Sequence, residues 1–243
     1  MKFQNDVMWH AMHWLGVTKP QINVVQIGCM DGKTLDKWHI HTLNDHWKCL
    51  FVEPIREYFD KLVDNKKKSD MFENAAITKE DGDIDMFVID PQKLADPNFE
   101  IEWGAGSSGY AGMSTLLPPK NGFASDYDRD IIIANKYGKM ITVKGMTLNS
   151  LLTKHGISEI DVFSVDAEGY DWDIFDDLDL EKYKPYVIEL EIMNSSEKEK
   201  TKIFSKLENY NYAYYVGPDN VFACPMDTYF EIKKWEAERH GLE

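Results

Sequence analysis

The chain has 243 residues, of which 43% are hydrophobic and 13% aromatic, a composition typical of a folded protein with a substantial core. A formal net charge of −15 argues against a nucleic-acid-binding surface, which needs clustered lysine and arginine. The three cysteines show no C-x-x-C spacing, and no stretch is apolar enough to span a membrane. We therefore expect a cytoplasmic protein with reduced thiols, folded as a single domain over residues 1–243.

A helix is predicted over residues 3–15, because apolar residues recur there at helical spacing before Gly16 and Pro20. We interpret residues 1–20 as a docking helix with surface histidines. The alternative is a cap over a substrate, in which His10 or His13 accepts a proton.

A glycine corner follows the first predicted strand, the apolar run at residues 24–27. Gly28 and Gly32 break this run, and a helix is predicted from Thr34 to Trp38. A strand, a glycine turn and a helix N-terminus together can hold a nucleotide. A second apolar strand at residues 50–52 ends in Glu53. An acid about 20 residues past a glycine turn can accept hydrogen bonds from ribose hydroxyls.

The details of the corner favour one kind of nucleoside. A dinucleotide fold needs G-x-G-x-x-G, but here Met30 occupies the place of a middle glycine. Asp31 would also repel a pyrophosphate. The corner better suits a cationic cofactor such as S-adenosylmethionine, which has a sulfonium, an ammonium, a ribose and no phosphate. An ordinary tight turn is the alternative.

The next elements are a helix that begins near Ile55, a strand over residues 71–78 and a strand over residues 83–90. Asn74 and the backbone of Ala75 are candidates to bond the adenine edge. Two β-α units followed directly by more strand favour an added hairpin beside a parallel sheet.

Residues 91–127 are rich in proline and glycine, and a loop of this length is usually a functional lid or a disordered insertion. We expect a lid, and the insertion stays open as the alternative. Residues 131–134 and 140–144 are short strand candidates.

Two acids follow a buried strand late in the chain. Thr147 is expected to cap a short helix, and the apolar strand at residues 160–165 then leads into Asp166 and Glu168. Ligands of open α/β sheets lie at the carboxyl ends of the strands, so both acids are expected to share a crevice with Gly28 and Glu53. The alternative is that they only start a helix, since acids suit a first helical turn.

The C-terminal part predicts a strand over residues 185–192, in which Glu189 or Glu191 lines the pocket. A charged helix over residues 197–209, a hairpin over 212–224 and a last helix over 228–239 complete the chain. Strands alternating with helices before a late hairpin predict an α/β fold with a mixed sheet and an antiparallel edge.

From about residue 22 to 224 the chain resembles the FkbM-type family of S-adenosylmethionine-dependent methyltransferases. The residues that carry the resemblance are Gln26-Ile27-Gly28-Cys29-Met30-Asp31-Gly32, Phe51-Val52-Glu53-Pro54, Asn74-Ala75-Ala76-Ile77, Thr147-Leu148-Asn149-Ser150-Leu151-Leu152 and Ile160-Asp161-Val162-Phe163-Ser164-Val165-Asp166-Ala167-Glu168-Gly169. The resemblance implies a Rossmann-like class I methyltransferase fold with a mostly parallel seven-stranded sheet and an antiparallel C-terminal hairpin. It also implies O-methylation of a small hydroxylated molecule, such as a sugar, glycan or natural product.

The expected site divides into two groups of residues. Catalysis, meaning removal of the acceptor proton, is assigned to Asp166 or Glu168. The cofactor-binding candidates are Gln26, Gly28, Cys29, Asp31, Gly32, Thr34, Glu53, Asn74, Ala75 and Asp166. No metal ligands are assigned, because the acids lack a firm ligand spacing.

One position departs from the family pattern. The first strand usually ends in an acid that bonds the cofactor ammonium, but this chain has Gln26, with Asp31 or Asp166 left to face the methionine end. Two other functions stay open: an NAD-linked oxidoreductase or epimerase, and a catalytically inactive adenosine-binding module.

Overall fold

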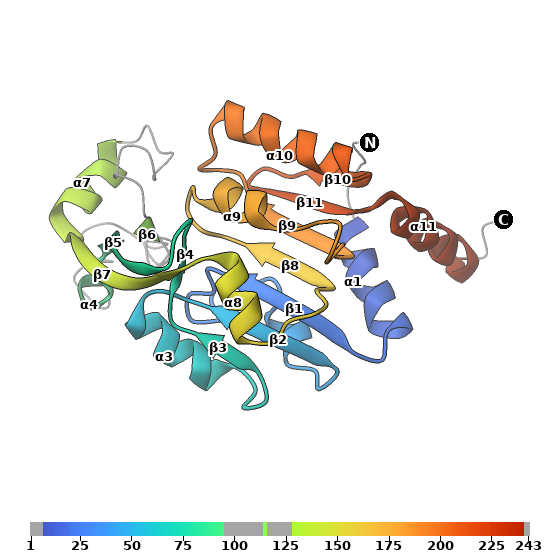
Figure 1. Ribbon diagram of the computed structural model, residues 1–243, viewed down its shortest axis with the longest axis horizontal. Helices are drawn as coiled ribbons and strands as arrows, with labels where there is room; N and C mark the ends of the chain where they lie inside the picture. The colour runs from blue at the N-terminus through green and yellow to red at the C-terminus, as the bar shows by residue number, and fades with distance from the viewer. Residues whose placement is uncertain (1–6, 95–113, 116–127, 241–243) are drawn as a thin grey trace.

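The computed structural model describes residues 7–94, 114–115 and 128–240. Figure 1 shows the arrangement of the helices and strands. The strands are β1 (Ile22–Ile27), β2 (Trp47–Val52), β3 (Met71–Glu73), β4 (Ala76–Ile77), β5 (Gly82–Ile89), β6 (Ser114–Thr115), β7 (Gly138–Met146), β8 (Val162–Val165), β9 (Val187–Glu191), β10 (Tyr212–Val216) and β11 (Asn220–Pro225). The helices are α1 (Val7–Thr18), α2 (His39–Thr42), α3 (Arg56–Asn65), α4 (Pro91–Leu94), α7 (Asp128–Tyr137), α8 (Leu148–Lys154), α9 (Asp171–Asp177), α10 (Glu197–Asn209) and α11 (Met226–His240).

Seven strands form the main sheet, in the order β10-β11-β9-β8-β1-β2-β3. The pairs that β1 makes with β2 and β8 are parallel, as are β8 with β9 and β2 with β3. Only β11 runs antiparallel to its neighbours, β9 and β10. The predicted α/β class, the mostly parallel sheet and the antiparallel C-terminal hairpin are confirmed.

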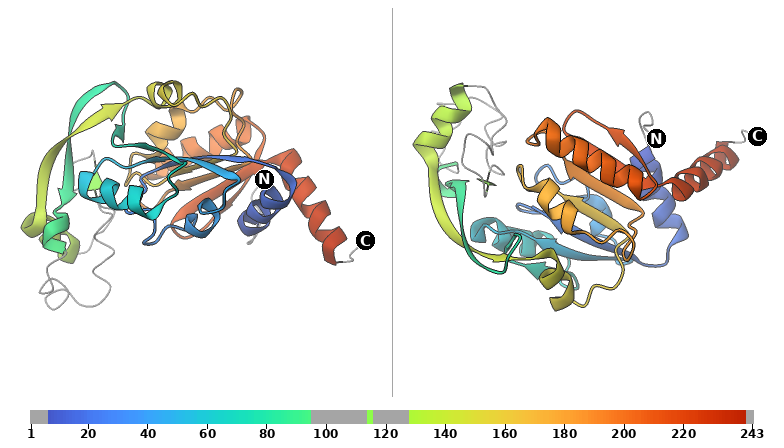
Figure 2. Two further views of the ribbon diagram at one scale, coloured as in Figure 1. Left: turned by 90° about the horizontal axis from the view of Figure 1, so that it is seen from below. Right: turned by 45° about the horizontal axis from the view of Figure 1, so that its top comes forward.

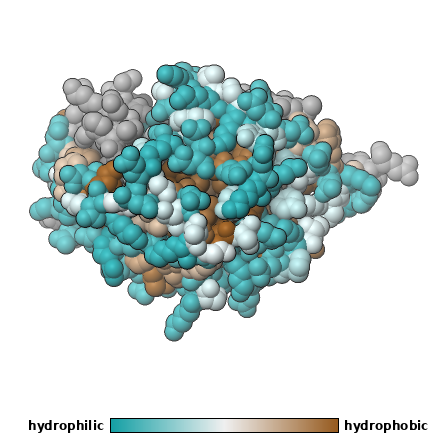
Figure 3. Space-filling view, viewed as in Figure 1, coloured by the Kyte–Doolittle hydropathy of each residue, from teal (hydrophilic) through white to brown (hydrophobic). Residues whose placement is uncertain are grey.

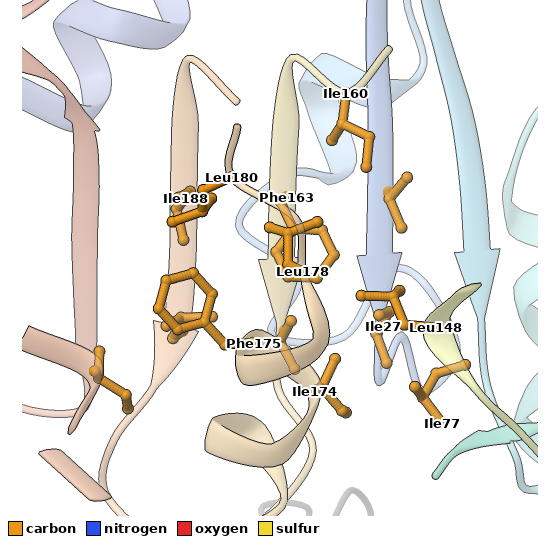
Figure 4. Packing of buried hydrophobic residues seen from close by; sticks show 14 of the residues in the cluster. Ile27, Ile77, Leu148, Ile160, Phe163, Ile174, Phe175, Leu178, Leu180 and Ile188 are labelled. Carbon is orange, nitrogen blue, oxygen red and sulfur yellow. The ribbon is translucent and has the colours of Figure 1, made fainter. Parts of the chain in front are cut away.

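Both faces of this sheet are covered by buried side chains, as a parallel sheet requires. One face packs against α8, α9 and α10, where Ile27, Phe163 and Phe175 belong to a single apolar cluster (Figure 4). The other face buries Trp38, Trp47 and residues of α1. Burying a large apolar side chain contributes about 1.5–3 kcal/mol, so these two layers hold the strands in register.

A smaller sheet has the order β4-β7-β5-β6 and extends away from the main one (Figure 2). Its long β5–β7 pair is antiparallel, so an antiparallel addition lies beside the parallel sheet as predicted. The two strands are not joined as a hairpin, because residues 90–137 separate them in the chain. The single strand predicted over residues 71–78 is wrong, because the chain leaves the main sheet after β3 and enters the small sheet at β4. At this switch point Asn74 Nδ2 donates to the carbonyls of Glu53 at 2.8 Å and Pro54 at 3.0 Å, which stabilises the exit from the main sheet.

Two other predicted elements differ. The strand expected at residues 131–134 belongs to helix α7, where Ile133 and Ala134 pack beside Ile89. The strand expected at 140–144 lies within β7, as predicted. Of the residues 91–127 interpreted as a lid, α4 and β6 are described, and the interpretation otherwise falls outside the described residues.

Helices α1 and α11 lie together at the end of the molecule opposite the small sheet (Figures 1 and 2). The face shown in Figure 3 is mainly hydrophilic, with hydrophobic residues gathered near its centre. Within the described ranges, no helix has the length and apolar character to cross a membrane.

Candidate active site

A cleft that is partly open to solvent lies at the carboxyl ends of the central strands. Gly28 follows β1, Glu53 follows β2 and Asp166 follows β8, and all three line it. Open α/β sheets bind their ligands at this edge. The cleft therefore lies where such a fold binds a ligand.

Most of the predicted site residues meet in this cleft. The lining includes Gln26, Gly28, Cys29, Thr34, Glu53, Ala75, Asp166 and Glu168. Three others, Asp31, Gly32 and Asn74, do not line it.

Gly28 forms a close junction between β1 and β8. Its φ is +79°, and a Cβ there would lie 1.7 Å from the carbonyl oxygen of Asp166. Gly32 has φ +68°, and a Cβ there would lie 2.4 Å from Cδ1 of Leu62, the end of a side chain of α3 that can move. Gly28 is therefore required by a backbone contact, whereas Gly32 is favoured by its backbone conformation.

The helix predicted from Thr34 to Trp38 is wrong, and with it the helix N-terminus of the corner. Residue Leu35 has φ +58°, and Asp36 Oδ1 accepts a hydrogen bond from the Trp38 amide at 2.9 Å. Such side-chain bonds to the backbone compete with helix formation. Only the short helix α2 forms, beginning at His39.

Asp31 was expected to face the methionine end of the cofactor, but its carboxylate is used within the turn. Oδ1 accepts from the amides of Lys33 at 2.9 Å and Thr34 at 2.7 Å, and Oδ2 accepts from the Thr34 hydroxyl at 2.7 Å. Asn74 likewise acts on the backbone, where it holds the end of β2. Asp31 and Asn74 therefore do not line the cleft, but they stabilise the backbone of segments that do.

Glu53 is 4% exposed and holds the corner from the β2 side. Its Oε2 accepts from the Met30 amide and its Oε1 from the Ile55 amide, both at 2.8 Å. Burial raises the pKa of Glu53 to about 8, and the nearby charge of Asp166 contributes to this rise. The two backbone hydrogen bonds lower the pKa but do not offset the effect of burial. Each carboxyl oxygen accepts one bond from the protein, and the group keeps further hydrogen-bonding capacity for a ligand.

The wall beyond Glu53 is apolar and contains Tyr58, which sequence reasoning did not single out. Met30, Ile55 and Met86 surround it. Tyr58 is 5% exposed, and its hydroxyl has no hydrogen-bond partner among the described residues. Its place three residues after Ile55, the residue that precedes α3, was the one signal in the sequence.

Four carboxyls gather on the opposite side of the cleft. Asp166 is exposed to it, Glu168 is half-buried, and Asp171 and Glu191 are buried. Asn194 Nδ2 donates to Glu168 Oε2 at 2.7 Å and Glu191 Oε1 at 3.2 Å. Loss of hydration and mutual repulsion raise the pKa of all four groups. Because Asp166 is exposed, water screens part of its shift, so it is the acid best placed to stay ionised near neutral pH.

Of the two acids in β9, Glu189 lines the cleft and Glu191 lies behind it. Glu189 accepts hydrogen bonds from Lys37 Nζ at 2.7 Å and Trp38 Nε1 at 2.5 Å. It also accepts from Ser164 and Asn220. It therefore ties the loop after β1 to the far strands of the sheet.

The N-terminal histidines do not line the cleft. His10 pairs with Glu236 of α11, and His13 contacts Arg239 and Trp235 there. In the part of the chain that the structure describes, no group of three or more His, Cys, Asp or Glu side chains is arranged to hold a metal ion. Asp166 and Glu168 are therefore the candidate bases that face the cleft.

Comparison with known proteins decides what this arrangement belongs to. The model of the Methyltransferase FkbM domain matches residues 26–214, which span β1 to β10. The chain belongs to this family. Family membership and the mostly parallel sheet with its antiparallel hairpin together give a class I methyltransferase fold.

No curated protein matches this FkbM-family chain. Among solved structures, it is similar to a chain in the crystal structure of a fibrillarin/Nop5p complex, at 10% identity and a TM-score of 0.41. That match covers 85% of this chain and 73% of the other. A likeness this slight adds nothing to the family match.

The family implies S-adenosylmethionine as the methyl donor, and the cleft of this FkbM-family protein suits that molecule. Gln26 is 6% exposed, and its Oε1 has no hydrogen-bond partner among the described residues. A buried acceptor without a partner is costly unless a ligand satisfies it. The ammonium of the cofactor is a matching donor for Gln26, and its ribose hydroxyls are matching donors for Glu53.

Proposed function

We propose that this protein is an S-adenosylmethionine-dependent O-methyltransferase that methylates a hydroxyl of a small molecule, such as a sugar, glycan or natural product. The observation that carries the proposal is the pairing, in one cleft, of a nearly buried acid, Glu53, with the unpartnered oxygens of Gln26 and Tyr58. These groups are spaced along a cleft whose other wall carries ionisable carboxyls.

When bound, the cofactor supplies a methyl group activated by its sulfonium. The protein has to orient the acceptor oxygen and remove its proton. In the proposal, Asp166 accepts that proton on a carboxylate oxygen, and Glu168, held by Asn194, orients the acceptor. Orientation can be worth about 7–11 kcal/mol of barrier, and a general base about 10²–10⁴-fold in rate.

Calorimetry and acceptor assays test the proposal. S-adenosylmethionine is expected to bind in a 1:1 ratio, and methyl transfer is expected to at least one member of a panel of sugars and other hydroxylated small molecules. Binding without turnover on a broad panel would favour the inactive adenosine-binding module. Binding of NAD in place of S-adenosylmethionine would favour the oxidoreductase or epimerase, which family membership disfavours.

A cytoplasmic location is also part of the proposal. All three cysteines, Cys29, Cys49 and Cys224, are buried free thiols. Unpaired cysteines are typical of a reducing compartment. Cell fractionation with a tagged chain would test this, and recovery from a secreted fraction would contradict it.

A further inference from the structure

Gln26 lies near the end of β1, and its side-chain amide has two distinct ends. Its Nε2 donates to Asp36 Oδ1 at 3.1 Å, while its Oε1 is buried, in a residue that lines the cleft. Asp36 was not among the residues singled out from the sequence. It lies in the loop after β1, ten residues downstream of Gln26.

Three donors hold Asp36 in place. Besides Gln26, the amide of Trp38 donates to Oδ1 at 2.9 Å, and Lys66 Nζ donates to Oδ2 at 2.7 Å. Lys66 is itself buried, bonds Thr42 Oγ1 at 3.0 Å and lies 4.6 Å from the centre of the Phe51 ring. Each oxygen of Asp36 therefore accepts from a donor of the protein, a backbone amide at Oδ1 and the buried Lys66 ammonium at Oδ2.

The oxygen of Asp36 that faces Gln26 already accepts from the Trp38 amide, so it acts as an acceptor. The end of the Gln26 amide that faces Asp36 is therefore the NH₂ group, and the carbonyl oxygen is the end left for a ligand. A glutamine without this partner can turn its amide over and present two N–H donors, which repel a cation.

We propose that Asp36 is a positioning residue that fixes the Gln26 carbonyl oxygen toward the cleft, so that Gln26 accepts a hydrogen bond from the ammonium group of the cofactor. The inference rests on the proposed function, since it concerns how the same cofactor is held. Asp36 thereby supplies through Gln26 the orientation that a carboxylate at position 26 would supply directly.

Two ligands separate this role from a structural one. S-adenosylhomocysteine carries the ammonium, whereas 5′-methylthioadenosine has the adenosine and the sulfur but no amino acid. In Asp36→Asn, calorimetry is expected to show about tenfold weaker binding of S-adenosylhomocysteine and unchanged binding of methylthioadenosine. Should Asp36→Asn fail to fold, Asp36→Asn/Lys66→Met, which removes both buried charges, replaces it.

Two further variants sharpen the comparison. Asp36→Asn/Gln26→Glu moves the carboxylate to position 26, so the affinity for S-adenosylhomocysteine is expected to recover. Tyr58→Phe removes the unpartnered hydroxyl from the wall beyond Glu53, which in the proposal faces the adenosine that both ligands share. It is therefore expected to weaken both ligands and serves as the matched control.

Equal loss of both ligands in Asp36→Asn, or no loss of either, would overturn the positioning role while leaving the proposed function intact. A wild-type protein that binds neither ligand would instead overturn the proposed function, and this inference with it.

Discussion

Glu53 combines an almost complete loss of solvent with a place on the wall of a cleft. Two backbone amides hold its carboxylate, and burial raises its pKa to about 8. If Glu53 only holds the turn, its substitution should lower stability and leave cofactor affinity unchanged. If Glu53 also binds the cofactor, its substitution should lower the affinity of the protein for the cofactor.

Glu53→Ala is expected to weaken S-adenosylmethionine binding at least tenfold, about 1.4 kcal/mol, because the ribose hydroxyls lose their acceptor. Isothermal titration calorimetry measures this. Glu57→Ala, an exposed acid on α3, is the matched control and should leave the affinity unchanged. An unchanged affinity in Glu53→Ala would remove the ribose assignment.

Asp166→Asn is expected to lower kcat by about 10²–10⁴-fold, because an amide cannot accept the acceptor proton. The midpoint of thermal unfolding should hold or rise, since Asp166 is exposed and the substitution removes a like charge beside Glu168. Steady-state kinetics and thermal denaturation measure the two effects. Asp176→Asn, on the exposed side of α9, is the control. Parallel loss of activity and stability would return Asp166 to a structural role.

At the scale of the element, the loop after β1 replaces the expected helix. It is held at one end by the glycine junction and at the other by Glu189, through Lys37 and Trp38. The junction requires two properties of Gly28, a positive φ and the absence of a Cβ. A pair of glycine substitutions separates these two requirements.

Gly28→Ala is expected to destabilise the protein by clearly more than Gly156→Ala. Both glycines have positive φ, +79° and +64°, so each alanine costs about 1–2 kcal/mol for the left-handed backbone. A Cβ at Gly156 meets open space, but at Gly28 it meets the Asp166 carbonyl at 1.7 Å. Chemical denaturation measures both. Similar losses of stability in the two variants would mean that β1 and β8 can move apart at little cost in free energy.

At the scale of the whole molecule, the buried carboxyls set how stability depends on pH. Burial and neighbouring acids raise the pKa of Glu191 from 4.5 to about 10, and burial raises that of Glu53 from 4.5 to about 8. Burial alone would also raise the pKa of Glu73, but hydrogen bonds from Lys144, Lys154 and His155 lower it to about 2.

The signs of these shifts predict a stability maximum in mild acid, at about pH 5. Glu53 and Glu191 stay protonated in the folded state after the unfolded chain has ionised. Their contribution to the free energy of unfolding is therefore greatest below pH 4.5. It falls as the pH rises above 4.5 and is lost once the pH has passed about 8 for Glu53 and about 10 for Glu191. Glu73 contributes above 4.5 and loses its effect as the pH falls toward 2. Thermal unfolding across this range measures the profile, and Glu53→Gln should flatten its alkaline side. A profile that rises steadily from mild acid to pH 8 would contradict the assignment.

The sequence predicted what depends on strand order and little of what depends on contacts between distant segments. Gly28, Glu53, Asp166 and Glu168 were expected together because parallel strands end at one edge, and they line one cleft. Their roles in binding and catalysis remain predictions.

Asp36 and Tyr58 could not be found in the same way. Asp36 depends on Lys66, thirty residues away, and Tyr58 on a small sheet whose strands the sequence does not pair. The helix expected after Thr34 failed for a related reason, since the side chain of Asp36 satisfies backbone that a helix would have used. Local pattern cannot show which of these bonds the folded chain prefers.

The junction at Gly28 couples the position of Glu53, which follows β2, to the position of Asp166, which follows β8. The backbone of Gly28 contacts the ends of both strands with no side chain between them. A substitution that moves Glu53 is therefore expected to move Asp166 as well. Relatives that accept different molecules are therefore expected to differ away from this point, on the small sheet beside Tyr58, where the backbone can move without disturbing the reacting groups.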